Sequence, residues 1–213
     1  AAVWAQENTR ASLFDAMERR ETYATTGPRI VVRFFGGFGY SEDDATAPDL
    51  ARVGYAGGVP MGGELARAPE GGAPRFLVSA LRDPEGAHLD RAQIVKQWLD
   101  PETGDVRERI YDVAVADGRT VDPDGRCRTP VGNTVDVEKA RYRNSIGDAS
   151  LSSAWQDPDF DPSTPAVYYL RVLEIPTPRW TTYDAVRFGT ALPDGVPATQ
   201  QQRAYTSPIW YRP

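Results

Sequence analysis

The sequence has little of the chemistry on which most hydrolytic active sites depend. Among 213 residues there is one histidine, His88, and one cysteine, Cys127. With a single histidine, Ser-His-Asp, Cys-His and His-rich metal sites are nearly impossible within this chain, and one cysteine excludes an internal disulfide. His88 follows a turn glycine and is interpreted as a surface residue. Cys127 lies between Arg126 and Arg128, which would favour nucleophilicity, but no activating base is evident.

Long apolar runs and runs of basic residues are also missing. No apolar run approaches the roughly 20 residues of a membrane span, and no charged-then-apolar leader opens the sequence. The net charge is −6, without a run of lysine or arginine. We therefore expect neither a nucleic acid nor an anionic membrane as partner. The opening Ala-Ala-Val-Trp is more typical of a point inside a longer protein than of a natural N-terminus.

Turn residues are plentiful and separate short apolar runs. The chain has 18 prolines and 19 glycines, many in clusters between segments with strand character, which is typical of a turn-rich β protein. Seven or eight strands at this spacing favour an antiparallel β-sandwich. The expected strands are residues 29–38, 75–81, 92–99, 106–115, 149–155, 166–175 and 205–211. Residues 92–99 and 106–115 are expected to pair as a hairpin across the turn at Pro101.

The N-terminal segment has a different pattern. Asn8 or Thr9 can cap a helix that runs to about Arg20, the only long helix we expect. A short strand over residues 21–25 and a turn over residues 26–28 follow. A helix followed directly by a strand suggests the last unit of an α/β domain, so the sequence predicts one unit over residues 1–28 and a β domain over residues 29–213.

Residues 166–175 form the strand around which the rest is expected to be organised. Its apolar side chains fall on both faces, as expected of a central strand covered on both sides: Val167, Tyr169, Leu173 and Ile175 on one, Tyr168, Leu170 and Val172 on the other. Pro176 and Pro178 end it. We expect residues 179–184 to form a polar-aromatic loop at its end, a common place for function.

Four residues in and near this loop are candidate substrate contacts: Thr26, Arg179, Trp180 and Tyr183. The Arg179 guanidinium suits phosphate, sulfate or carboxylate groups, and the Trp180 ring could stack on a ligand. The alternatives are structural, with Trp180 filling the core and Arg179 paired with Asp184 or Glu174.

Two other segments are weaker candidates. Asp157, Asp159 and Asp161 alternate with Pro158, Phe160 and Pro162, so a calcium site is conceivable, although Asp-Pro pairs also make ordinary turns. The glycine-rich residues 57–63 lack the Lys-Ser/Thr of a phosphate loop, and their glycines are expected to serve turns or close packing. The acidic residues 41–44 are interpreted as a solvated loop.

Several strings of the sequence together resemble one family. They are Glu7-Asn8-Thr9-Arg10, residues 20–29, Val59-Pro60-Met61-Gly62-Gly63, residues 157–162, residues 175–184 and the ending Thr206-Ser207-Pro208-Ile209-Trp210-Tyr211. The family, DUF3604, is a bacterial one of unknown function whose N-terminal part is similar to PHP-type (polymerase and histidinol phosphatase) metal-dependent hydrolases. The resemblance covers essentially the whole chain.

The resemblance implies that this chain is the C-terminal part of a longer hydrolase. The divalent metal ions (zinc, manganese or iron) and their ligands would lie upstream, and this chain would bind none. His88 stands where relatives are expected to have Asn. Residues 9–27 would supply the last helix and strand of the hydrolase barrel, followed by an immunoglobulin- or fibronectin-like sandwich.

Two functions remain open from the sequence. In the first, the chain completes a PHP-like phosphoesterase or related ester hydrolase, walls its pocket beside a small anionic substrate, and is inactive alone. In the second, the chain is a non-enzymatic sandwich that binds carbohydrate or protein through Trp180, Tyr183 and the Asp157–Asp161 loop.

Overall fold

Two sheets make up most of the computed structural model, which describes residues 1–213. The larger sheet has eight strands, β1 (Ala2–Val3), β2 (Thr22–Thr25), β5 (Glu64–Leu65), β7 (Leu89–Leu99), β8 (Val106–Val115), β10 (Ala166–Glu174), β13 (Arg203–Thr206) and β14 (Ile209–Tyr211). The smaller sheet has four, β4 (Val59–Pro60), β3 (Val31–Gly37), β6 (Arg75–Leu81) and β9 (Ser150–Gln156). Every pair is antiparallel except β14 with β5.

The main apolar core lies between the two sheets. It contains 20 buried residues, with Val32, Phe34 and Phe76 from the smaller sheet and Ile94 and Leu170 from the larger. Burial of this apolar surface is the main favourable contribution to folding, since no disulfide crosslinks the chain. The prediction of a mainly β, antiparallel fold is confirmed, and no strand set closes into a barrel.

The central position of β10 is confirmed, but its two faces differ. β10 pairs with β7 along one edge and with β13 and β14 along the other. Tyr168, Leu170 and Val172 are fully buried, whereas Val167 and Tyr169 on the opposite face are only half-buried. The prediction that both faces are covered is therefore wrong. A shift in register after Leu173 then allows two successive residues, Glu174 and Ile175, to be buried.

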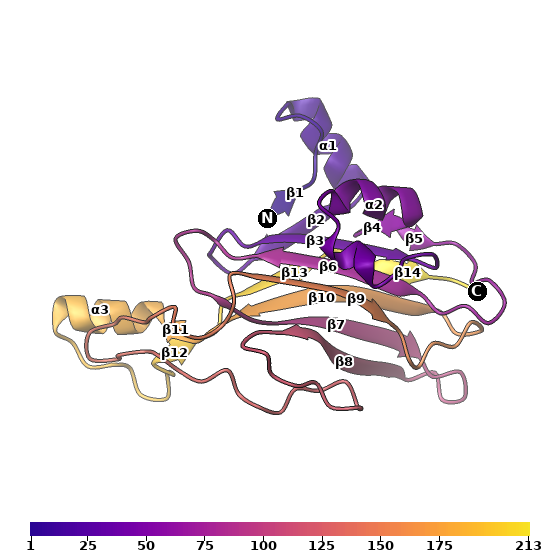
Figure 1. The fold of residues 1–213 in the computed structure, drawn as a ribbon. Helices are drawn as coiled ribbons and strands as arrows, with labels where there is room; N and C mark the ends of the chain where they lie inside the picture. Colours follow the sequence, from indigo (N-terminus) through magenta and orange to yellow (C-terminus); the bar gives the residue numbers. More distant parts are fainter.

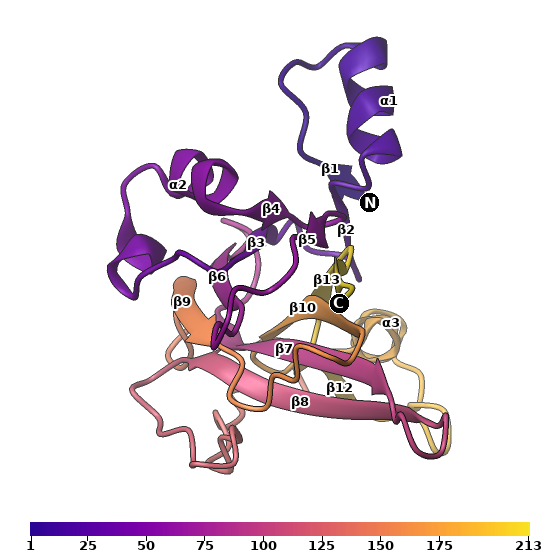
Figure 2. The ribbon, with the colours of Figure 1, turned by 90° about the vertical axis from the view of Figure 1, so that its right-hand side faces the viewer.

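The N-terminal segment is joined to the larger sheet. Helix α1 (Arg10–Glu18) begins at the Thr9 cap as expected, and the Thr9 side chain accepts a hydrogen bond from the Ser12 N–H. β2 pairs with β1 on one edge and β13 on the other. The expected boundary near residue 28 therefore does not coincide with a break in the sheet. Figure 2 shows α1 projecting away from both sheets.

Most of the expected strands are present, and the 92–99/106–115 hairpin is confirmed as β7 and β8. Several features were not expected, among them the following three. Helix α2 (Leu50–Gly57) precedes the glycine-rich segment, a short 3-10 helix (Asp43–Thr46) occupies the acidic loop, and residues 205–211 contribute two strands, β13 and β14, rather than one. None of the helices has the length and apolar character needed to cross a bilayer.

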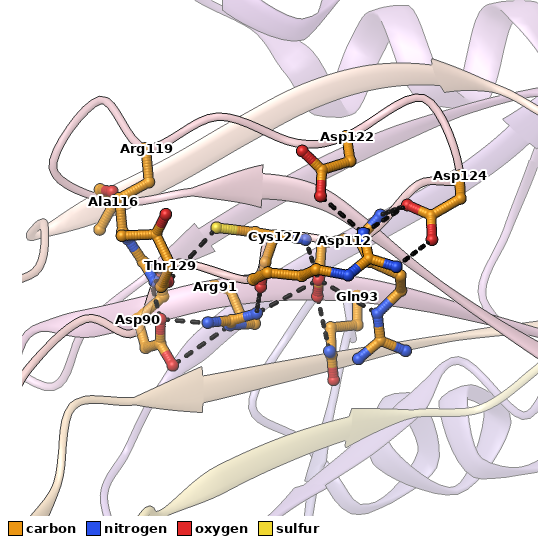
Figure 3. A network of polar contacts seen from close by, with 12 residues as sticks. Asp90, Arg91, Gln93, Asp112, Ala116, Arg119, Asp122, Asp124, Cys127 and Thr129 are labelled. Carbon is orange, nitrogen blue, oxygen red and sulfur yellow. Dashed lines mark hydrogen bonds and ion pairs between the residues drawn. The ribbon is translucent and has the colours of Figure 1, made fainter.

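A long irregular segment, residues 117–149, is anchored to the β7–β8 hairpin by polar contacts (Figure 3). The fully buried Asp112 carboxylate accepts hydrogen bonds from the Gln93 amide, the Arg91 guanidinium and the Cys127 backbone N–H. Cys127 is itself buried, and its thiol faces the Thr129 carbonyl. Because the partners of Asp112 come from β7 (Arg91 and Gln93) and from the loop (Cys127), this carboxylate fixes the loop against the sheet.

Candidate functional site

A pocket at the end of β10 gathers candidate residues from distant parts of the sequence. It is a hollow of about 240 Å³. Its walls come from the turn after β2, the β6–β7 turn, the long loop, the end of β10, the small sheet formed by β11 (Thr177–Pro178) and β12 (Thr199–Gln200), and helix α3 (Trp180–Phe188). The lining residues are Pro28, Gly86, Ala87, Tyr142, Glu174, Thr177, Pro178, Trp180, Tyr183, Gln200 and Gln202. We call it the Glu174 pocket.

Glu174 is the most unusual residue of this pocket. It is 1% exposed, and its Oε1 atom has no hydrogen-bond partner in the protein. Gly86 lies close above it, since a Cβ atom there would come within 3.3 Å of Oε1. Burial, with a further contribution from the negative charge of Asp83, raises the pKa of Glu174 to about 8 against the opposing charge of Arg82. The carboxyl is therefore largely protonated at neutral pH and can donate a hydrogen bond.

The neighbouring Asp83 takes the opposite protonation state. Its carboxylate accepts hydrogen bonds from the backbone N–H groups of Arg29 (2.7 Å) and Glu85 (3.1 Å). These bonds hold the pKa of Asp83 below its usual value. These two nearby carboxyl groups thus differ in protonation, because only Asp83 accepts hydrogen bonds from backbone N–H groups.

Helix α3 and the long loop add aromatic surface to the pocket. Trp180 and Tyr183 lie one turn apart on α3 and are 62% and 44% exposed. Burial raises the pKa of Tyr142 and of Tyr183, so both hydroxyl groups stay protonated and can donate as well as accept. The prediction of a loop over residues 179–184 is wrong, because these residues form the N-cap and the first part of helix α3. The interpretation of Trp180 as core filler is also wrong, given its exposure.

Arg179 takes a different role from either one expected of it. It is the N-cap residue of α3, its N–H donates to the Ala198 carbonyl, and its own carbonyl accepts the Thr182 N–H. Its Nε atom is buried without a hydrogen-bond partner. Arg179 forms no ion pair with Asp184 or Glu174, and it does not line the Glu174 pocket. It supports the helix rather than the pocket wall.

Thr26 is connected to the pocket by a hydrogen bond to one of the lining residues. Its hydroxyl group donates to the side-chain oxygen of Gln202 and accepts the Arg203 N–H. Gln202 lines the pocket, and its carbonyl accepts the Glu174 N–H. Three of the four predicted contacts, Thr26, Trp180 and Tyr183, are thus brought together, whereas Arg179 lies apart.

The three aspartates for which a calcium site was conceivable are each bonded to protein groups. Asp157 is buried and bonded to the Lys96 ammonium (2.7 Å) and the Tyr168 hydroxyl. Asp159 binds Arg109 and Tyr111, and Asp161 binds the side chains of Ser163 and Thr164, together with the Ser163 N–H. Each carboxylate is bonded to a different protein group. In residues 1–213, no three carboxylate, imidazole or thiol side chains lie close enough together to hold a metal ion. The alternation of aspartates here serves structure.

The sequence alone did not identify the groups that give the pocket its character. Glu174 was considered only as an ion-pair partner, and Tyr142 and Gln202 gave no signal. A carboxylate inside the apolar string Leu173-Glu174-Ile175-Pro176 was the one available hint, because a charged residue in a buried strand needs a reason. His88 is half-buried, with Nδ1 3.1 Å from the Ile146 carbonyl, and it belongs to the loop anchor rather than to the pocket.

The fold and the pocket define a mainly β protein with a pocket lined by polar and aromatic residues. A family model described as "Protein of unknown function (DUF3604)" matches residues 1–213, so the chain belongs to the DUF3604 family. No curated protein and no solved structure matches it.

Proposed function

We propose that this chain binds a neutral, hydroxyl-rich small molecule, such as a carbohydrate, in the Glu174 pocket. The observation that carries this proposal is an unpartnered, buried carboxyl group beside exposed aromatic rings. Sugars present apolar C–H faces that stack on rings such as Trp180, and hydroxyl groups that exchange hydrogen bonds with amides and acids.

The charge of the pocket favours a neutral ligand over an anionic one. Glu174 is the only titratable carboxyl in its lining, and no arginine or lysine lines it. An anion would therefore meet no cation there and would be repelled once Glu174 ionised. The ligand groups expected to reach Glu174 are hydrogen-bond acceptors such as hydroxyl or ether oxygens.

A calorimetric titration of neutral mono- and disaccharides into the 213-residue chain tests this proposal. We expect saturable binding by at least one sugar, and a loss of about tenfold or more in Trp180→Ala, since aromatic anchors dominate such sites. Phe188→Ala is the matched control, because Phe188 is 68% exposed on the same helix but does not line the pocket. Equal losses in both variants, or no binding of any sugar, would contradict the proposal.

We also propose that the chain works as the C-terminal part of a PHP-like metal-dependent hydrolase, a phosphoesterase or related ester hydrolase. The resemblance of its strings supports this, as does α1, on which Phe14 and Met17 are 61% and 52% exposed. Exposed apolar side chains of this kind mark a contact surface. In this proposal the two-sheet fold is an immunoglobulin- or fibronectin-like module.

The pairing of β2 changes how such a hydrolase domain would attach. Both edges of β2 are already hydrogen-bonded within the larger sheet, so β2 has no free edge to offer a barrel. The upstream domain would instead pack on α1. Expression of the complete gene, with metal analysis and assays on phosphate mono- and diesters, tests the hydrolase proposal. A complete product without bound metal and without esterase activity would contradict it.

A further inference from the structure

A second cavity lies on the outer face of the larger sheet, and its lining is rich in arginine. It has a volume of about 260 Å³ and is lined by Asp90, Arg91, Gln93, Arg171, Leu173, Gln201 and Arg203. Strand register explains the grouping, because Leu173 pairs with Arg91 on one side and with Arg203 on the other. Directly paired residues project to the same face of a sheet, and Arg171 joins them two residues away on β10.

Two of these arginines are held in place by buried carboxylates. The Arg91 guanidinium contacts Asp90 and Asp112, each at 3.2 Å, and donates to the Cys127 carbonyl. Figure 3 shows this contact set around Arg91. Arg171 Nε donates to the Gln93 side-chain oxygen at 2.8 Å, and the Gln93 amide in turn donates to Asp112. A buried chain from Asp112 through Gln93 therefore orients Arg171.

Positive charge remains in excess after these pairs are counted. Asp90 is bonded to Arg119 (2.6 Å), Arg91 and Gln201, so its charge is already balanced. Arg171 and Arg203 form no ion pair, and their side-chain hydrogen bonds go to Gln93 and Tyr205. The two terminal nitrogens of Arg171 have no protein partner. Such concentrated positive charge is unusual in a chain with net charge −6.

We propose that this cavity binds a tetrahedral oxyanion, the phosphate or sulfate group of a small molecule, between Arg171, Arg203 and Arg91. Guanidinium groups present paired N–H donors that match such oxygens, and the bonds are strengthened by charge. Gln201 lies between this cavity and the Glu174 pocket, and its amide donates to the Asp90 carboxylate and the Glu174 carbonyl. The two sites are nevertheless chemically distinct, and this proposal does not depend on the ligand of the Glu174 pocket.

Titration with inorganic phosphate and with sulfate, at constant ionic strength set by sodium chloride, tests the oxyanion site. Constant ionic strength is needed because salt screens exposed charges. We expect saturable binding that weakens about 10- to 100-fold in Arg171→Gln and Arg203→Gln, the range for losing a charged hydrogen bond. Glycerol phosphate and a sulfate monoester then show which ester is preferred.

Matched variants separate a built site from a general charge effect. Arg67→Gln removes the same charge from an exposed residue that has no hydrogen bond or ion pair, and it should leave binding unchanged. Arg203 is exposed, so Arg203→Gln should fold normally, and weaker binding in this variant would reflect the lost guanidinium rather than misfolding. Trp180→Ala should not affect oxyanion binding. No saturable binding of phosphate or sulfate, or an equal loss in Arg67→Gln, would overturn the proposal.

Discussion

At the scale of single residues, the protonation of Glu174 sets the chemical character of the pocket at the end of β10. A carboxyl group that is buried without a donor resists ionisation, and the adjacent Asp83, which has two backbone donors, does not. The pair therefore places one negative charge and one neutral acid close together at pH 7. The neutral acid lines the Glu174 pocket, whereas the ionised one does not.

The protonation of Glu174 has a consequence for stability that can be measured. Its pKa is about 8 in the folded chain and about 4.3 in an unfolded one, so the folded state binds more protons between these values. The free energy of unfolding should therefore fall as pH rises from about 4.5 to 8, by about 1.4 kcal/mol for each unit of pKa difference. Above pH 8 this contribution levels off.

Glu174→Gln isolates this effect, because glutamine keeps the shape and neutrality of the protonated acid. Urea unfolding of the variant should show greater stability than the natural chain at pH 8.5 and a similar stability at pH 5. Asp83→Asn should act in the opposite sense, since it removes a favourable ionised acceptor. If the natural chain and Glu174→Gln have the same pH dependence, Glu174 is ionised normally and the description of the pocket is wrong.

At the scale of elements, the helices are where the sequence was least informative. Residues 180–188 read Trp-Thr-Thr-Tyr-Asp-Ala-Val-Arg-Phe, which is rich in residues of modest helix propensity. Tertiary contacts stabilise α3 nevertheless: the Thr182 hydroxyl donates to the Ala198 carbonyl, and Gly189 adopts a left-handed C-cap (φ 64°). A glycine after residue 188 is a local signal that can end a helix, whereas the contact with Ala198 depends on the fold.

Helix α2 offers a prediction in which packing and propensity act in opposite directions. Gly54 is buried, and a Cβ atom there would lie 2.5 Å from the Phe35 ring. Alanine would favour the helix by about 1 kcal/mol, but the clash with a fully packed ring should cost more, for a net loss of about 1–3 kcal/mol. Thermal and urea unfolding of Gly54→Ala measure this difference.

The control for α2 is Ala56→Gly, at an exposed position of the same helix. It should lose up to about 1 kcal/mol from propensity alone. A Gly54→Ala chain more stable than the natural one would show that Phe35 can move aside, and that α2 is less closely packed on β3 than described.

Helix α1 gives the prediction that distinguishes a free surface from an interface. Phe14 is 61% exposed, so Phe14→Ala should change the stability of this chain by less than about 0.5 kcal/mol. In the product of the complete gene the same change should cost about 3–5 kcal/mol if a second domain covers α1. Phe34→Ala, in the core, should be costly in both proteins. A negligible effect of Phe14→Ala in both would contradict the proposed docking on α1.

At the scale of the whole molecule, the sheets were far more predictable than the pocket. Period-two apolar patterns and proline-glycine turns located β6, β7, β8 and β10 to within a few residues, because those signals are local. The pocket depends on residues as far apart as Pro28 and Gln202, and no local pattern encodes that proximity. Trp180 and Tyr183 were found only because they follow the end of a strand.

The two proposed binding regions differ in charge. The Glu174 pocket has no cation in its lining, while the cavity on the outer sheet face has three arginines. Gln200 and Gln202 line the first, and Gln201 and Arg203 line the second, so the short segment that joins β12 to β13 contributes alternate side chains to both. If both proposals hold, the two regions would therefore select ligands of different charge.

The most direct test is the pH dependence of sugar binding to the natural chain and to Glu174→Gln. Affinities are measured by calorimetry between pH 6 and about 9.5, a range that spans the pKa of Glu174. If the protonated carboxyl donates to the ligand, affinity in the natural chain is constant below pH 7 and declines above about pH 8, whereas Glu174→Gln shows no decline. An affinity independent of pH in both chains, or sugar binding unaffected by Trp180→Ala, would contradict recognition in the Glu174 pocket.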